Sequence, residues 1–285
     1  MSSDACATPT RFGALTDTGG RRAVNEDAVL AHPPVFCVAD GMGGHSRGAM
    51  ASAAVVGAFD DLARAISDAG GTAEVSAEQV QAAVIEAQAR IRAELGLDAP
   101  ESDAEMTAGS TLAGVILTRA DERLCWLAFN VGDSRIYRFT GGALTRVSVD
   151  HSLVQEMIDA GEIDEEQALT HPMRNMITRA VGSGVEVSPD FWLLGAGQGD
   201  RLMLCSDGLI NEVSEQEIEA TLAGGGTPQQ VSETLMARAT FRGARDNVSV
   251  VVIDLDLPRQ VDDVTAPRLA GAYDPEDTMP REYAT

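Results

Sequence analysis

Acidic residues stand beside short apolar stretches at several places in this sequence. Asp40 directly follows the apolar run 35–39, and Asp207 follows the run 202–205 after one serine. Carboxylates placed repeatedly at strand ends are expected to share one cluster, and clustered carboxylates repel one another strongly enough to need cations. The same placement recurs at Asn25-Glu26-Asp27, at Asp133 and at Asp246. The sequence therefore predicts a metal site built from carboxylates.

The ligand types indicate which metal and which reaction to expect. Carboxylate oxygens suit Mg²⁺ or Mn²⁺, and the four histidines show no spacing that would favour Zn²⁺. Two such ions about 3.5–4 Å apart can share a carboxylate, lower the pKa of a water and stabilise an in-line displacement at phosphorus. The predicted chemistry is hydrolysis of phosphoesters.

Arginine is the only cationic side chain available to bind a phosphate, because all 21 basic residues are Arg. The absence of lysine excludes Walker-type phosphate binding and Schiff-base chemistry. Arg22 precedes Asp27 by five residues, so its planar guanidinium can face the metal cavity, whereas Arg21 is expected in solvent. A net charge of −23 argues against nucleic acid and anionic membranes as partners.

The segment 35–48 is the centre around which the other elements must be arranged. The run 35–39 contains no polar residue and predicts a short strand that is buried on both faces. The glycines at 41, 43 and 44 can adopt positive φ, which allows a sharp turn with main-chain groups open to a ligand. Residues 47–69 are then expected to form a helix. For this segment taken alone, a tight strand-to-helix connection with a capping aspartate is the alternative explanation.

The remaining pattern predicts an α+β fold. Further helices are expected at 76–95, 214–222 and 227–241, and strands at 11–15, after Asp27, and at 110–118, 123–131, 135–140, 143–149, 185–194, 201–205 and 248–257. Short loops between strands predict antiparallel hairpins. Two early helices, two late helices and the strands between them predict a four-layer αββα sandwich, with two antiparallel sheets and a helix pair outside each.

We expect one domain at 11–257 between two tails. Residues 1–10 form the N-terminal tail, and residues 258–285 are rich in proline and acids without apolar periodicity, which is typical of disorder. Within the domain, residues 151–182 interrupt the strands with short helical pieces and predict a mobile flap beside the carboxylates. A variable surface subdomain is a compatible interpretation of the same segment.

The cysteines indicate a reducing compartment. Cys37, Cys125 and Cys205 lie in apolar stretches, Cys6 lies in the N-terminal tail, and no two form a CxxC pair. No stretch has the pattern of a signal peptide or approaches the roughly 20 apolar residues of a spanning helix. We therefore expect a cytoplasmic protein, and we expect it to be a monomer.

Six motifs, in their order along residues 11–257, resemble those of the metal-dependent protein phosphatase family of the 2C type, and above all its compact bacterial serine/threonine members. They are Arg22 with Asn25-Glu26-Asp27, Val38-Ala39-Asp40-Gly41-Met42-Gly43-Gly44-His45, Gly109-Ser110-Thr111-Leu112, Val131-Gly132-Asp133-Ser134-Arg135, Ser206-Asp207-Gly208-Leu209 and Asp246-Asn247. The resemblance implies hydrolysis of phosphoserine and phosphothreonine in proteins by a metal-activated water, opposite a cytoplasmic serine/threonine kinase. It also implies a central β-sandwich with helix pairs outside.

The resemblance further implies residue roles around two core ions, Mn²⁺ or Mg²⁺. Asp40 would bridge both ions, Gly41 would give its carbonyl to the second, and Arg22 would bind the substrate phosphate. The other ligands would be Asp207 and Asp246 for the first ion, Glu26 and Asp27 for the second ion or its waters, and Asp133 with Asp207 for a third ion. The flap would be the segment 151–182.

Two positions depart from the family pattern. Met42 stands where animal members carry a histidine, so protonation of the leaving group is expected to fall to a metal-bound water, and His45 is expected to have a structural role at the helix start. Asn211 stands where some relatives carry an acid, which predicts a weak third site.

There are two alternatives to an active phosphatase. The first is a pseudophosphatase that binds phosphoproteins without turnover, although no principal ligand is missing. The second is a structural domain whose turn acids coincide by chance.

Overall fold

The computed structural model describes residues 9–44, 46–70, 74–97, 108–121, 123–183 and 187–256. The expected tail at 258–285 lies outside these ranges, and so does His45. Of the expected N-terminal tail, only Pro9 and Thr10 are described, and Thr10 already begins the first strand. No helix in these ranges is long and apolar enough to cross a membrane.

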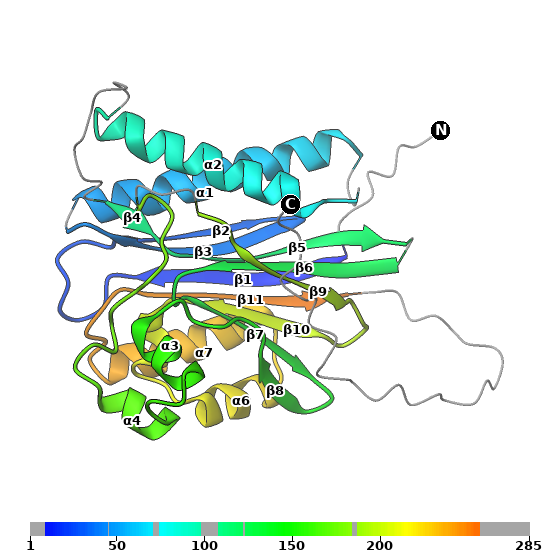
Figure 1. Ribbon diagram of the computed structural model, residues 1–285. Helices are drawn as coiled ribbons and strands as arrows, with labels where there is room; N and C mark the ends of the chain where they lie inside the picture. The colour runs from blue at the N-terminus through cyan, green and yellow to red at the C-terminus, as the bar shows by residue number, and fades with distance from the viewer. Residues whose placement is uncertain are drawn as a thin grey trace, which may run out of the picture.

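Two antiparallel sheets lie face to face at the centre of the molecule (Figure 1). The first has the order β1 (Thr10–Asp17), β11 (Val248–Leu255), β10 (Arg201–Cys205), β7 (Arg135–Thr140) and β8 (Ala143–Arg146). The second has the order β2 (Asp27–His32), β3 (Val35–Met42), β5 (Leu112–Ala120), β6 (Arg123–Val131) and β9 (Asp190–Gly195), with β4 (Gly109–Ser110) paired to β3.

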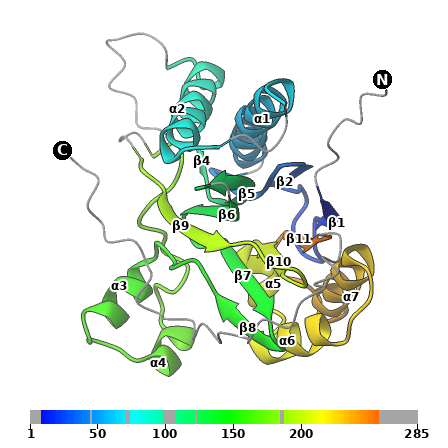
Figure 2. The ribbon, with the colours of Figure 1, turned by 90° about the vertical axis from the view of Figure 1, so that its right-hand side faces the viewer.

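Helices cover the outer face of each sheet, as Figure 2 shows along the layers. α1 (Ser46–Asp68) and α2 (Ala77–Glu94) lie on the second sheet, whereas α6 (Glu215–Ala223) and α7 (Pro228–Phe241) lie on the first. α2 begins with the capping box of Ser76 and Gln79, which satisfies main-chain donors that the first helical turn leaves unpaired. The predicted four-layer αββα sandwich is confirmed.

Three apolar cores fill the three interfaces between these layers. β3 contributes to two of them, because Val35, Cys37 and Ala39 pack toward α1 while Phe36 and Val38 pack between the sheets. All five side chains are fully buried, so the predicted strand buried on both faces is confirmed. The third core lies between the first sheet and helices α6 and α7. The buried strand β3 therefore determines where Asp40 lies.

The clearest differences from the predicted elements concern β9, β8 and one additional short helix. β9 begins at Asp190 rather than at 185, because Pro189 has no N–H to donate to the ladder. β8 ends at Arg146 rather than at 149. The short helix α5 (Asp207–Ile210) was not predicted, since four residues are too few to show a helical period.

The segment 151–182 forms a separate small subdomain that contains α3 (Leu153–Asp159) and α4 (Glu165–Thr170). Figure 2 shows these two helices standing apart from the sheets. Isolated bridges join Ser152 to Ile177 and Ser110 to Val181, so the subdomain is attached near both of its ends. That this segment is a mobile flap stays a prediction.

Candidate metal centre

Two of the predicted ligands face each other across neighbouring strands. Asp27 at the start of β2 is the cross-strand partner of Asp40 in β3. Asp40 was expected to close its strand, but β3 continues to Met42, so Asp40 and Gly41 lie within the pairing. The antiparallel register of β2 and β3 therefore brings two carboxylates from separate motifs to one place.

Thr111 holds the main chain of Asp40 in position. The amide of Asp40 donates to Thr111 Oγ1 at 2.9 Å, and the amide of Thr111 donates to the Asp40 carbonyl at 2.9 Å. Thr111 Oγ1 also lies 2.7 Å from Ser134 Oγ, next to Asp133. The Gly109-Ser110-Thr111 motif thus connects the turn that carries Asp133 to the strand that carries Asp40.

The side chain of Asp27 is held by two buried hydroxyl groups. Ser206 Oγ donates to Asp27 Oδ2 at 2.8 Å, and Ser249 Oγ donates to the same atom at 2.7 Å. The second carboxylate oxygen, Oδ1, is buried without a hydrogen-bond partner. Such an oxygen is costly to bury unless it meets a donor or a cation. Asp27 is therefore oriented by the fold and left with one free ligand atom.

Glu26 and Gly41 form a second close group. The Gly41 amide donates to the Glu26 carbonyl at 3.1 Å, while Glu26 Oε1 is buried and unpaired. A Cβ on Gly41 would lie 2.0 Å from the carbonyl oxygen of Gly48, so glycine is required by close packing. The expectation of positive φ holds for Gly43 and Gly44 and is wrong for Gly41.

Arg22 and Asp246 lie on the same side of the site. Arg22 Nη2 donates to Asp246 Oδ2 at 2.7 Å, and Nη1 lies 3.7 Å from Glu26 Oε2. Asn247 supports both segments, because its Oδ1 accepts from the Glu26 amide at 2.8 Å and its Nδ2 donates to the carbonyls of Thr18 and Val24. A guanidinium thus lies among the predicted ligands, as expected from the position of Arg22 in the chain.

The last two predicted ligands stand beside strand ends, Asp207 after β10 of the first sheet and Asp133 in the turn between β6 of the second sheet and β7 of the first. Asp207 begins α5 directly after β10, and its Oδ2 accepts from Asn211 Nδ2 at 3.1 Å. Asp133 follows β6 and precedes β7. The charge of Asp207 is the largest electrostatic contribution to the raised pKa of Asp133, so these two carboxylates are close enough to interact.

The raised pKa values of the carboxyl groups indicate that the site favours a bound cation. Burial is the main cause that raises the pKa of Asp27 and of Asp207 to about 6, and that of Asp133 to about 7. The pKa of Asp40 is raised well above its usual value by burial and by the charges of Asp27, Asp207, Asp133 and Asp246. A hydrogen bond from Asp40 helps to stabilise ionised Asp207. Carboxyls that must share protons in this way are the groups that bound cations would hold ionised.

The donor set fits small divalent cations that retain water. Within the described ranges, no three His, Cys, Asp or Glu side chains converge into a ready metal cage. Mg²⁺ does not need such a cage, because it keeps several waters and is bound through one or two carboxylates. Glu26 Oε1 and Asp27 Oδ1 are unpaired oxygen donors, and the Gly41 carbonyl oxygen lies beside Glu26 Oε1, since a Cβ on Gly48 would be 2.8 Å and 2.4 Å from these two atoms. These residues therefore fit Mg²⁺ or Mn²⁺.

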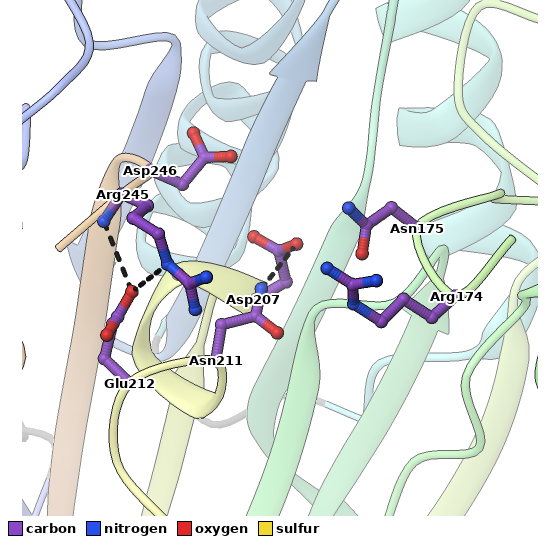
Figure 3. Close-up of a pocket in the computed structure, with 8 residues that line it drawn as sticks. Arg174, Asn175, Asp207, Asn211, Glu212, Arg245 and Asp246 are labelled. Carbon is purple, nitrogen blue, oxygen red and sulfur yellow. Dashed lines mark hydrogen bonds and ion pairs between the residues drawn. The ribbon is translucent and has the colours of Figure 1, made fainter. Parts of the chain in front are cut away.

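A cavity of about 220 Å³ opens beside Asp207 and Asp246. Figure 3 shows Arg174 and Asn175, from the segment 151–182, on one side and Arg245 with Glu212 on the other. The amide and Nε of Arg245 both donate to Glu212 Oε1. The sequence interpretation had not singled out Arg174, Asn175, Glu212 or Arg245, and only their nearness to His171-Pro172, Ser206-Asp207-Gly208 and Asp246-Asn247 could have indicated them.

Comparisons with known proteins agree with this arrangement. The family model described as protein phosphatase 2C matches residues 20–237. The serine/threonine phosphatase stp of Listeria monocytogenes serovar 1/2a is 34% identical over 253 residues, which cover 86% of this chain and 96% of the relative. The serine/threonine protein phosphatase PstP of Mycobacterium tuberculosis is 37% identical over 280 residues, or 96% of this chain and 51% of that protein.

Solved structures show the same architecture. The M. tuberculosis phosphatase PstP/Ppp superposes with a TM-score of 0.76 at 35% identity, covering 87% of this chain and 99% of that one. The catalytic domain of PstP, solved in complex with two manganese ions, has a TM-score of 0.73 at 33% identity, covering 86% of this chain and 97% of that one. The sequence match and the two-sheet fold thus point to one family. The chain belongs to the protein phosphatase 2C family.

Proposed function

We propose that this protein is a metal-dependent protein serine/threonine phosphatase that hydrolyses phosphoserine and phosphothreonine. The observation that carries the proposal is the meeting of five aspartates and Glu26, from five separate motifs, around one part of the fold with Arg22 among them. The named phosphatases among its relatives support the same activity. A structural domain without a metal site would have nothing to offset the cost of burying the carboxylates of Asp27, Asp40, Asp133 and Asp207 beside one another.

The proposed ligands divide between two core ions, Mn²⁺ or Mg²⁺. Asp40 would bridge both ions, since the charges of the four other aspartates of the site act on it. Asp207 and Asp246 would complete the first site, and the Gly41 carbonyl with Glu26 and Asp27 would serve the second ion or its waters. When bound, these ions would supply an activated water and neutralise charge that develops on the phosphoryl group.

Arg22 would bind the substrate phosphate. Its guanidinium is half-exposed and contacts Asp246, so a fork of N–H donors stands at the open side of the carboxylates. Met42 packs beside Gly109 and has no proton to donate, which leaves protonation of the leaving alkoxide to a water. Asp133 would act with Asp207 at a third, weaker site that orients such a water.

The setting of the reaction is also a proposal. We infer that the substrates include a serine/threonine kinase or its targets, that the protein acts in the cytoplasm, and that it is monomeric. Cys37, Cys125 and Cys205 are free and buried, which supports a reducing compartment. The net charge of −23 agrees with substrates that are phosphoproteins rather than nucleic acids.

Hydrolysis of p-nitrophenyl phosphate and of a phosphothreonine peptide tests the proposal. Both reactions should require added Mn²⁺ or Mg²⁺, and a chelator should abolish them. A pseudophosphatase would bind the phosphopeptide with micromolar or tighter affinity and release no phosphate at any metal concentration. That outcome would replace the proposed enzyme with its non-catalytic alternative.

A further inference from the structure

His151, the first residue of the flap segment, is joined to the turn that carries Asp133. The Gly132 amide donates to His151 Nδ1 at 3.0 Å, and the His151 amide donates to the Gly132 carbonyl at 2.9 Å. His151 is only 7% exposed. One residue of the flap thus binds both main-chain polar groups of the residue directly before Asp133.

The hydrogen bonds determine which tautomer of His151 is present. Because Nδ1 accepts a hydrogen bond from the Gly132 amide, the ring proton must be on Nε2. Nε2 lies 3.3 Å from Asp190 Oδ2, at ion-pair distance although not in good hydrogen-bond alignment. Arg179 Nη1 donates to the other oxygen of Asp190 at 2.7 Å. Asp190 therefore faces the donor nitrogen of His151 and is itself held in place.

The same residues close the base of the flap. The Thr178 amide donates to the His151 carbonyl at 2.9 Å, so the entering and leaving segments of the flap meet at His151. Arg179 directly follows Thr178 and contacts Asp190, the first residue of β9. The geometry around His151 consequently depends on how the flap is seated against β9.

Close packing and hydrogen bonds restrict the main chain of the turn at Gly132. Gly132 has a φ of 99°, and a Cβ there would lie 2.7 Å from Thr111 Cγ2. Asn130 Nδ2 also donates to the Gly132 carbonyl at 3.0 Å. That carbonyl belongs to the same peptide group as the amide of Asp133. Fixing the Gly132 peptide therefore fixes the position of the Asp133 Cα, from which the carboxylate side chain extends.

A second pair binds the far side of the same turn. Asp150, the residue before His151, accepts from Arg135 Nε at 3.0 Å and from Arg135 Nη2 at 2.6 Å. Asp150, directly before the flap, and His151, its first residue, thus hold Arg135 and Gly132, which flank Asp133 and Ser134. The start of the flap is therefore joined to this turn by several hydrogen bonds, on both sides of Asp133.

We propose that His151 is a positioning residue that couples the seating of the flap to the Asp133 carboxylate and thereby tunes the weak cation site that Asp133 forms with Asp207. The inference rests on the proposed function, because that function gives Asp133 its ligand role. His151 itself touches neither the substrate nor an ion. Residues that orient metal ligands in this way typically change metal affinity by about 10- to 100-fold when replaced.

Two amide substitutions at His151 separate positioning from general support. In His151→Asn the side-chain oxygen can occupy the place of Nδ1 and accept from the Gly132 amide. In His151→Gln the longer amide reaches toward the place of Nε2 and loses that acceptor. The matched control is His171→Gln, since His171 Nδ1 also accepts from a flap amide, that of Met173 at 3.2 Å, away from the turn.

The measurements are calorimetric titration with Mn²⁺, amide hydrogen exchange at Gly132 and thermal stability, each on the full chain. We expect His151→Gln to weaken the weakest Mn²⁺ site by about tenfold or more and to speed exchange at Gly132. We expect His151→Asn and the His171→Gln control to stay within about threefold of wild type, at equal melting temperatures.

Equal losses in His151→Asn and His151→Gln would overturn the positioning role, and so would fast Gly132 exchange with unchanged Mn²⁺ binding. Neither measurement requires turnover. If the wild-type protein hydrolyses no phosphoester while the two variants still differ in Mn²⁺ binding, the proposed function fails and the coupling stands. If turnover is normal and the variants bind Mn²⁺ alike, the coupling fails and the proposed function stands.

Discussion

Asp27 and Asp40 are cross-strand partners in the antiparallel pair β2–β3, so two carboxylates stand directly opposite each other. Like charges in this position destabilise a sheet. Here the pKa of Asp27 is raised to about 6, first by burial, and that of Asp40 is raised as well. The fold therefore stores electrostatic repulsion at the place where the metals are proposed to bind.

Asp40→Asn should have opposite effects on stability and on activity. Removing one of the opposed charges should raise the melting temperature of the chelator-treated protein by roughly 2–4 °C for each kcal/mol of relieved repulsion. Turnover with saturating Mn²⁺ should fall below detection, because the proposed bridging ligand loses its charge. Thermal melts in chelator and a p-nitrophenyl phosphate assay test both effects, and near-normal turnover would show that Asp40 does not bridge.

The metal-free protein should lose stability as the pH rises from about 4 to about 7. Asp27, Asp207 and Asp133 have folded-state pKa values raised to about 6, 6 and 7 from 3.8. Below pH 4 these groups are protonated in both states, whereas at higher pH the unfolded chain ionises first and unfolding becomes easier. At about 1.4 kcal/mol per pKa unit, each of the three groups alone accounts for about 3–4 kcal/mol, and their joint loss is smaller than the sum because they titrate together.

Urea unfolding in chelator at pH 5 and pH 8 measures this loss. Saturating Mn²⁺ should remove it, because the bound ions hold the carboxylates ionised. Asp190, whose pKa is lowered to about 2 first by its contact with His151, contributes the opposite dependence, but only below about pH 4. Metal-free stability that rises between pH 5 and pH 8 would contradict the assigned repulsion.

Arg22→Ala should raise the KM for a phosphopeptide by roughly tenfold, the cost of one charge-assisted hydrogen bond, with a smaller change in kcat. A guanidinium that grips oxygens of the phosphate binds substrate and transition state with similar strength. Arg21→Ala is the matched control, since it removes the same charge one residue away. Steady-state kinetics with both variants decide the matter, and equal effects would remove the reason for assigning the phosphate to Arg22.

Asp133→Ala should leave the two core ions bound and slow turnover. The loss should be larger for a phosphothreonine peptide than for p-nitrophenyl phosphate, because nitrophenolate leaves without much protonation. Metal content, kcat on both substrates and the melting temperature are the measurements. If Asp133 only stabilises its turn, both substrates should lose rate alike and the melting temperature should drop.

The local pattern of the sequence was sufficient to predict most elements of the fold. The apolar run 35–39 predicts a strand buried on both faces, and its five side chains do pack into two different cores. The capping box at Ser76 and Gln79 marks the start of α2 correctly. Such features depend on residues within one or two turns of each other, so they can be read without knowing the tertiary fold.

The types of the predicted site residues also followed from the sequence, because several strand-end carboxylates that share one place need cations to offset their repulsion. Their arrangement did not. The register that sets Asp27 opposite Asp40, and the hydroxyls of Ser206 and Ser249 that orient Asp27, join segments far apart in the chain. Ser249 is a polar residue within an apolar strand, and that pattern does not indicate what its hydroxyl contacts.

Only the tertiary structure brought Arg174 and Arg245 to one cavity and placed His151 against the Gly132 turn. These contacts depend on how the segment 151–182 folds back over the strand ends. A contact between distant segments is determined by the packing of whole layers, and no local periodicity encodes it. The sequence by itself therefore determined which chemistry this protein could perform, and the packing of two sheets and a flap decided which side chains are in position to perform it.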